Sequence, residues 1–146
     1  MKFILSEEQE MLKTTARTFL ANECPKTLVR KMIEDEVGHS SDLWKKMADV
    51  GWLGLIFPEE YGGMGMNFRD LTILCEEMGR AMMPGPFLST LLLAGLPILA
   101  AGTEEQKKEF LPKIASGELV LTLAVLEDDG DLWPEGVRLK ATQRGD

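Results

Sequence analysis

The sequence predicts a mainly α-helical domain followed by the first strands of a β domain, and three observations support this fold class. Apolar residues recur at intervals of three and four through most of residues 6–117, which is the spacing of one helix face. Two capping boxes, beginning at Ser6 and Thr103, mark helix starts. Beyond the second of these helices, apolar residues become continuous and then alternate, as in strands. We therefore expect a helical domain over 1–118 and the beginning of a truncated β domain over 119–146.

Two helices are predicted near the N-terminus. Ser6 begins the first, because Gln9 three residues later completes a capping box with it. Pro25 suits the first turn of the second, where its missing N–H does no harm. The predicted inner faces comprise Leu12, Ala16, Phe19 and Leu20 in the first helix and Leu28, Val29, Met32 and Ile33 in the second.

The middle of the chain is predicted to hold two helices separated by an irregular segment. A short helix follows the loop at 37–41, and Gly51 suits its end because glycine readily adopts a left-handed conformation. Three glycines and a proline within residues 58–65 predict turns rather than regular structure. The next helix is expected over about 69–82, and its inward residues are predicted to be Leu71, Leu74, Cys75 and Met78.

The fifth and sixth predicted helices differ in character. Residues 87–101 are apolar nearly all round, which is typical of a helix buried in the middle of a bundle, and Pro97 should kink or interrupt it. The capping box at Thr103 opens the sixth helix, which passes through Phe110, Leu111 and Ile114 and closes at Gly117.

Two strands are predicted after the helices. Residues 119–126 indicate a strand buried on both faces, and residues 137–142 alternate as a half-buried strand. Two strands are marginal as a sheet in water, and an apolar strand with an unpaired edge invites aggregation. We therefore expect the chain to be a fragment of a longer protein or one part of an assembly.

Composition and charge exclude several classes of function. The net charge of −8, with basic residues scattered among acids, disfavours binding to nucleic acid and to anionic membranes. The most apolar stretch is too short for a membrane span, and the acidic N-terminus does not resemble a signal peptide. We therefore expect a cytoplasmic protein.

The titratable side chains predict neither a metal site nor a nucleophilic triad. Cys24 and Cys75 are too few for a disulfide framework and lack the partners of a metal site, so free thiols are expected. His39 is the only histidine. The acidic residues at 127–131 lack the calcium-loop pattern and predict a solvated turn rather than a cation site.

Three stretches, in this order, resemble the acyl-CoA dehydrogenase family. The first runs Gly-Trp-Leu-Gly-Leu at 51–55 and continues as Pro-Glu-Glu-Tyr-Gly-Gly-Met-Gly at 58–65. The second runs Gly-Thr-Glu-Glu-Gln-Lys-Lys at 102–108 and continues through Leu-Pro-Lys and Ala-Ser-Gly-Glu within 111–118. The third is a strand that reaches Glu127 soon afterwards. Together they extend the resemblance over essentially the whole chain.

The resemblance implies an architecture and a chemistry. The expected enzyme has an N-terminal helical domain, a middle β domain and a C-terminal four-helix domain, binds FAD, and passes electrons to an electron-transfer flavoprotein. A glutamate removes the α-proton of an acyl-CoA thioester while the β-hydrogen leaves as hydride to the flavin. That glutamate belongs to the C-terminal domain, so no catalytic residue is expected in this chain. Acyl-CoA oxidases and some flavin monooxygenases share this architecture.

The resemblance also suggests which residues of this chain border substrate and cofactor. One wall of the acyl pocket would come from the apolar helix after residue 86, which suits a fatty-acyl tail. Its candidate residues are Phe87, Leu88, Ser89, Leu92 and Leu93, and the alternative is that they are ordinary core residues.

The flavin contact implied by the resemblance departs from the family pattern. The family has Thr-Glu-Pro followed by a Gly-Ser-Asp run, where this chain has Leu126-Glu127-Asp128 and Gly130-Asp131. Leu123, Val125 and Leu126 are the candidates for packing on the flavin or offering backbone groups. Leu126 lacks the threonine hydroxyl, so flavin binding is expected to be altered or lost.

Three hypotheses about function follow. The first is the N-terminal portion of a flavin-dependent acyl-CoA dehydrogenase, in a homo- or hetero-oligomer. The second is a non-catalytic subunit that pairs with a catalytic relative, which the altered flavin motif suggests. The third, a free-standing helical module for apolar ligands, leaves the terminal strands unexplained.

Overall fold

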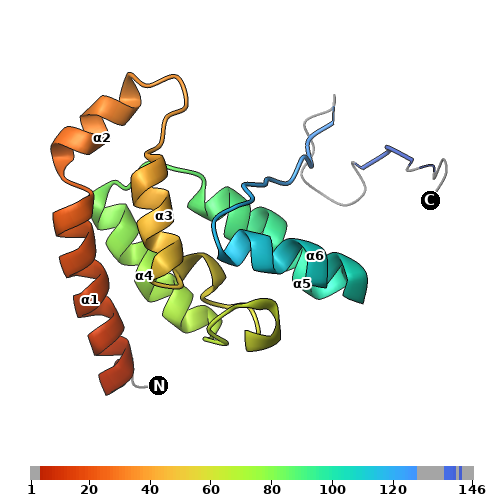
Figure 1. The fold of residues 1–146 in the computed structure, drawn as a ribbon, viewed down its shortest axis with the longest axis horizontal. Coiled ribbons are helices and arrows are strands. Elements are labelled where there is room, and N and C mark those ends of the chain that lie inside the picture. Colours follow the sequence, from red (N-terminus) through yellow and green to blue (C-terminus); the bar gives the residue numbers. More distant parts are fainter. Residues whose placement is uncertain (1–3, 128–136, 141, 143–146) are drawn as a thin grey trace.

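The computed structural model describes residues 4–127, 137–140 and 142, and within them the fold is helical (Figure 1). Helices α1 and α4 run side by side, α5 and α6 pack together, and the segment after α6 leaves the helices. The α-helices are α1 (Glu7–Glu23), α2 (Lys26–Ile33), α3 (Ser41–Asp49), α4 (Phe68–Ala81), α5 (Leu96–Ala101) and α6 (Glu104–Ala115). Two 3₁₀ turns, η1 (Trp52–Gly54) and η2 (Glu59–Tyr61), and a π-helix, η3 (Leu88–Gly95), complete them.

Both predicted capping boxes are confirmed. The Ser6 hydroxyl accepts from the Gln9 backbone N–H at 3.2 Å while the Gln9 amide oxygen accepts from the Ser6 N–H. Thr103 and Gln106 make the same reciprocal pair at the start of α6. A third box, which the sequence analysis did not identify, opens α4 through Asn67. Each box satisfies backbone donors that the first turn of a helix leaves unpaired.

The loop between α3 and α4 folds back on itself and packs against α6. The amide of Gly65 donates to the Phe57 carbonyl at 2.8 Å, and the loop is irregular as predicted. A Cβ atom added to Gly63 would lie 2.0 Å from the same oxygen, so only glycine fits there. The Tyr61 hydroxyl donates to the Glu104 carboxylate at 2.9 Å. The first two of the three stretches that support the family resemblance, at 51–65 and 102–118, therefore contact each other.

The apolar segment at 87–101 is not buried all round, so that prediction is wrong. Leu91 is buried, whereas Leu88 is 56% exposed and Leu93 is 49% exposed. The change from π-helix to α-helix falls just before Pro97, which fits the predicted interruption, because proline disturbs the backbone bonding of the preceding turn. This helix therefore has one face in the core and one apolar face towards solvent.

The described residues after α6 form no strand, which corrects the prediction of strands at 119–126 and 137–142. Val120, Leu123 and Leu126 are 45%, 45% and 63% exposed, and Leu139 is 84% exposed. A strand needs a neighbouring strand for its backbone groups, and the described residues offer none to this segment. Residues 128–136, 141 and 143–146, including the acidic turn and Ala141, lie outside the described residues.

Most predicted inward residues are buried or half-buried, with one exception. Ile33 in α2 is 78% exposed, whereas Val29 and Met32 of the same helix are buried. Cys24 is buried and Cys75 half-buried, both as free thiols, and burial raises the pKa of each thiol. Within the described part of the chain, no helix is both long and apolar enough to cross a membrane.

Candidate functional site

An apolar recess lies where α4 ends and η3 begins. Its volume is about 210 Å³, and it is open to solvent on one side. The chain turns between the two helices through Met82 and Gly85, whose φ angles are 53° and 138°. Among the described residues, no other non-glycine residue has a positive φ. The lining residues are Cys75, Met78, Gly79, Met82, Met83, Gly85, Phe87 and Leu88.

The chemistry of this recess suits an apolar group. Met78, Met82 and Met83 place three polarizable thioethers around it, and methionine adapts to irregular apolar shapes. The Cys75 thiol is held neutral, because burial raises its pKa. No group of three or more metal-ligating side chains occurs among the described residues, so nothing here resembles a metal centre.

The structure brings together only some of the predicted substrate residues. Phe87 and Leu88 line the recess, although Phe87 is also part of the core. The hydroxyl of Ser89 donates to the Pro86 carbonyl at 3.0 Å and so stabilises the turn. Leu92 packs partly against the core, and Leu93 is half exposed on the same helix. Neither leucine lines the recess, but Leu93 adds to the exposed apolar face of η3.

The sequence analysis missed the contribution of α4. Six of the eight lining residues, from Cys75 to Gly85, belong to α4 or the turn that follows it. The signal was the turn itself: Pro84-Gly85-Pro86 joins two helices by a short connection, and short connections place helix ends next to one another. Apolar residues on both sides of that turn could have been assigned to one site.

Thr90 is a second residue that the sequence analysis missed. Its side chain is buried and contacts the backbone of the segment after α6, donating to the Leu121 carbonyl at 3.1 Å and lying 3.3 Å from the Leu121 amide. The hydroxyl therefore holds residue 121 against η3. No sequence pattern reveals this contact, because it joins residues 31 positions apart.

The predicted flavin residues do not form a cofactor site by themselves. Leu123 and Leu126 are exposed, Val125 is half-buried, and none of the three lines the recess. These side chains offer no hydroxyl or charged group to a flavin. The described residues therefore do not fit an FAD site alone, and we assign no chemistry to that group here.

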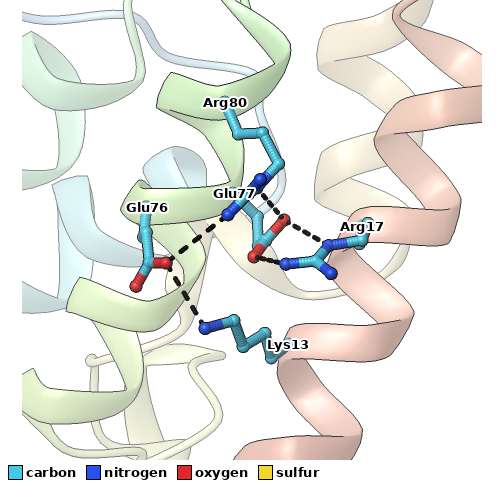
Figure 2. Close-up of polar contacts among 5 residues, drawn as sticks. All are labelled: Lys13, Arg17, Glu76, Glu77 and Arg80. Carbon is cyan, nitrogen blue, oxygen red and sulfur yellow. Dashed lines mark hydrogen bonds and ion pairs between the residues drawn. The ribbon is translucent and has the colours of Figure 1, made fainter.

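An ion cluster joins α1 to α4 (Figure 2). The Glu77 side chain is fully buried and accepts from Arg17 Nε at 3.0 Å and Arg17 Nη2 at 2.8 Å. Arg80 Nε lies 3.3 Å from the same carboxylate. The hydrogen bonds from Arg17 hold the pKa of Glu77 below its usual value. A buried carboxylate with such partners is a structural anchor between two helices.

Comparison with known proteins identifies the family. The sequence pattern of the family described as "Acyl-CoA dehydrogenase, N-terminal domain" matches residues 6–118. Acyl-CoA dehydrogenase FadE12 of Mycobacterium tuberculosis is 35% identical over 133 residues, covering 87% of this chain and 32% of that protein. The chain belongs to the acyl-CoA dehydrogenase family, and its helices correspond to the N-terminal domain.

Solved structures share the fold. An acyl-CoA dehydrogenase from Bacillus anthracis, complexed with FAD, superposes with a TM-score of 0.77 at 33% identity, over 87% of this chain and 22% of that one. The Tcur3481-Tcur3483 steroid ACAD G363A variant gives a TM-score of 0.76 at 34% identity, over 84% of this chain and 33% of that one. The chain spans about a third of the length of the curated relatives that it matches.

Proposed function

We propose that this chain is the N-terminal helical part of a flavin-dependent acyl-CoA dehydrogenase, and that η3 with the adjoining recess forms one wall of its acyl pocket. The observation that carries the proposal is the exposed apolar face of η3 next to an apolar recess. Leu88 belongs to both, since it is 56% exposed and lines the recess. Apolar side chains left in water beside a hollow are typical of a surface that receives an apolar ligand or another domain.

The remainder of the site must come from outside these residues. The family resemblance implies that the glutamate base lies in a C-terminal domain and that the flavin is bound largely by a β domain. We propose that the segment at 119–127 becomes a strand when it pairs with that β domain, while Thr90 keeps residue 121 against η3. FAD, an acyl-CoA and an electron-transfer flavoprotein are the cofactor, substrate and electron acceptor of this proposal.

One experiment tests the role of η3 in the complete enzyme. Leu88→Trp narrows the recess, so we expect KM to rise about tenfold for a long-chain acyl-CoA and to change little for a short-chain one. A tenfold rise corresponds to the loss of the contacts of about one to two buried methylene groups. The measurement is steady-state reduction of an artificial electron acceptor with both substrates. Ile33→Trp, on the exposed side of α2, is the matched control and should change neither KM. Equal effects of Leu88→Trp on both substrates would contradict the proposed wall.

The isolated chain gives a second test. Because it contains no candidate for the glutamate base, we expect residues 1–146 to show no turnover of any acyl-CoA with added FAD and an artificial acceptor. Turnover by the isolated chain would contradict the proposal that the catalytic residues lie outside these 146 residues.

The second candidate is a non-catalytic subunit that pairs with a catalytic relative. Leu126 in place of the family threonine favours it, because the side chain offers the flavin no hydrogen bond. A similar solved structure is described as the Tcur3481-Tcur3483 steroid ACAD, with two proteins in its name. Co-purification from the source cells distinguishes the candidates: a polypeptide that carries its own flavin and base supports the first, and a separate catalytic relative supports the second.

A further inference from the structure

A second pocket lies between the end of α1, the start of α2 and the end of α4. Its volume is about 270 Å³, and it is open to solvent. Only Met82 is common to this pocket and to the recess, so the two occupy different sides of the end of α4. Its lining comprises Arg17, Leu20, Ala21, Cys24, Pro25, Lys26, Glu77, Arg80, Ala81 and Met82, and we call it the α1–α2 pocket.

The lining combines an apolar floor with a cationic rim. Six of the ten residues are apolar, while Arg17, Lys26 and Arg80 carry positive charge and Glu77 carries the one negative charge. This sign is opposite to that of the whole chain, whose net charge is −8. The positive end of the α2 dipole adds to it, because Pro25 caps that helix without a side-chain hydrogen bond. The pocket is therefore complementary to an anion with an apolar body.

Glu77 orients two of the cationic side chains of the rim. It accepts hydrogen bonds from Arg17 and forms an ion pair with Arg80, so that both guanidinium groups are held at one carboxylate (Figure 2). Both arginine side chains remain about half exposed, at 51% and 57%. Arg80 Nη2 also lies 3.9 Å from Glu76. A guanidinium has five N–H donors, so each arginine keeps donors beyond those that face these carboxylates. Guanidinium groups already oriented by a buried carboxylate lose little freedom when they bind a second carboxylate.

We propose that the α1–α2 pocket binds a carboxylate with a short apolar tail, of the size of a medium-chain fatty acid anion. The tail lies against Leu20, Ala81 and Met82, and the carboxylate pairs with the cations of the rim. The volume suits a ligand of this size and is below that of most drug-sized sites. This site shares only Met82 with the recess of the proposed acyl wall and carries no catalytic group.

Calorimetric titration of the 146-residue chain with octanoate tests the proposal, with 1-octanol and octylammonium as probes that share the same tail. We expect octanoate to bind saturably, 1-octanol to bind about tenfold more weakly because it lacks charge-assisted hydrogen bonds, and octylammonium not to bind. No heat with octanoate, or equal affinity for octanoate and 1-octanol, would overturn the proposal.

Variants locate the site. Lys26→Gln removes one cation of the rim, and we expect about threefold to tenfold weaker octanoate binding. Ala21→Leu fills the pocket from an exposed helix position and should abolish binding. Arg30→Gln, an exposed charge on α2 outside the lining, is the matched control, and Leu88→Trp in the recess should leave the affinity unchanged. Binding that responds to Leu88→Trp but not to Lys26→Gln would place octanoate in the recess and refute this site.

Discussion

At the scale of single residues, two glycines with different surroundings separate steric from entropic effects. A Cβ atom at Gly63 would meet the Phe57 carbonyl at 2.0 Å, whereas one at Gly79, on the exposed side of α4, would meet nothing within 4 Å. Glycine is thus required at position 63, because the backbone there lies against the backbone of Phe57. Gly79 lies within a helix, where alanine is expected to increase the free energy of unfolding.

We therefore expect opposite effects from the same substitution. Gly63→Ala should lower the free energy of unfolding by about 3 kcal/mol, because backbone must move to admit the methyl group. Gly79→Ala should raise it by about 0.5–1 kcal/mol. Urea unfolding followed by circular dichroism measures both. A Gly63→Ala chain as stable as the parent would show that this loop approach is not tight.

At the scale of elements, the buried carboxylate of Glu77 is one of the polar contacts that join α1 to α4, beside the hydrogen bond from Gln9 to Asp70. The hydrogen bonds from Arg17 to Glu77 are charge-assisted only while Glu77 is ionised, and they lower its pKa from the ordinary value of 4.5. A lowered pKa in the folded state means that Glu77 stabilises the fold fully above about pH 4.5. That stabilisation is lost as the pH falls through the lower folded pKa.

Glu77→Gln tests this dependence. At neutral pH we expect the variant to lose about 2 kcal/mol of stability, because two arginines lose a charged partner. Its stability should also fall less steeply than that of the parent below pH 4.5, because one carboxylate with a lowered pKa is absent. Unfolding in urea across acidic pH measures both slopes. Glu36→Gln, at an exposed position between α2 and α3, is the control and should follow the parent closely. Parallel acid profiles for Glu77→Gln and the parent would rule out this role.

At the scale of the whole molecule, apolar surface is concentrated after the last helix. Leu123 and Leu126 are exposed there and make no part of the helical core. Apolar residues in an extended segment with free backbone groups favour association with other chains. The net charge of −8 opposes this association, but charge repulsion is screened at physiological salt.

We expect the isolated chain to self-associate in a concentration-dependent way, and the double variant Leu123→Glu with Leu126→Glu to remain monomeric. Sedimentation velocity over a range of concentrations measures this. Thr122→Glu adds charge to the same segment without removing apolar surface, so it should still associate. Helix content should be unchanged in all three, because these side chains lie outside the core. A parent chain that is monomeric at every concentration would contradict the expectation.

Local signals in the sequence determined the helices. Capping boxes at Ser6 and Thr103 and the left-handed glycines at 51 and 117 act within a few residues of themselves, so their effect can be predicted without knowing the rest of the chain. The family resemblance likewise depends on short stretches, and it is confirmed over residues 6–118.

Only the tertiary structure decided where surfaces and pockets lie. The sequence predicted a strand at 119–126, but strand formation depends on a neighbour, and the described residues supply none. It also predicted burial all round for the helix near Leu93, although exposure depends on which elements cover it. The contact of Thr90 with residue 121 and the pairing of Arg17 with Glu77 join distant positions. Local sequence therefore determined the helices, whereas contacts between distant residues formed the sites.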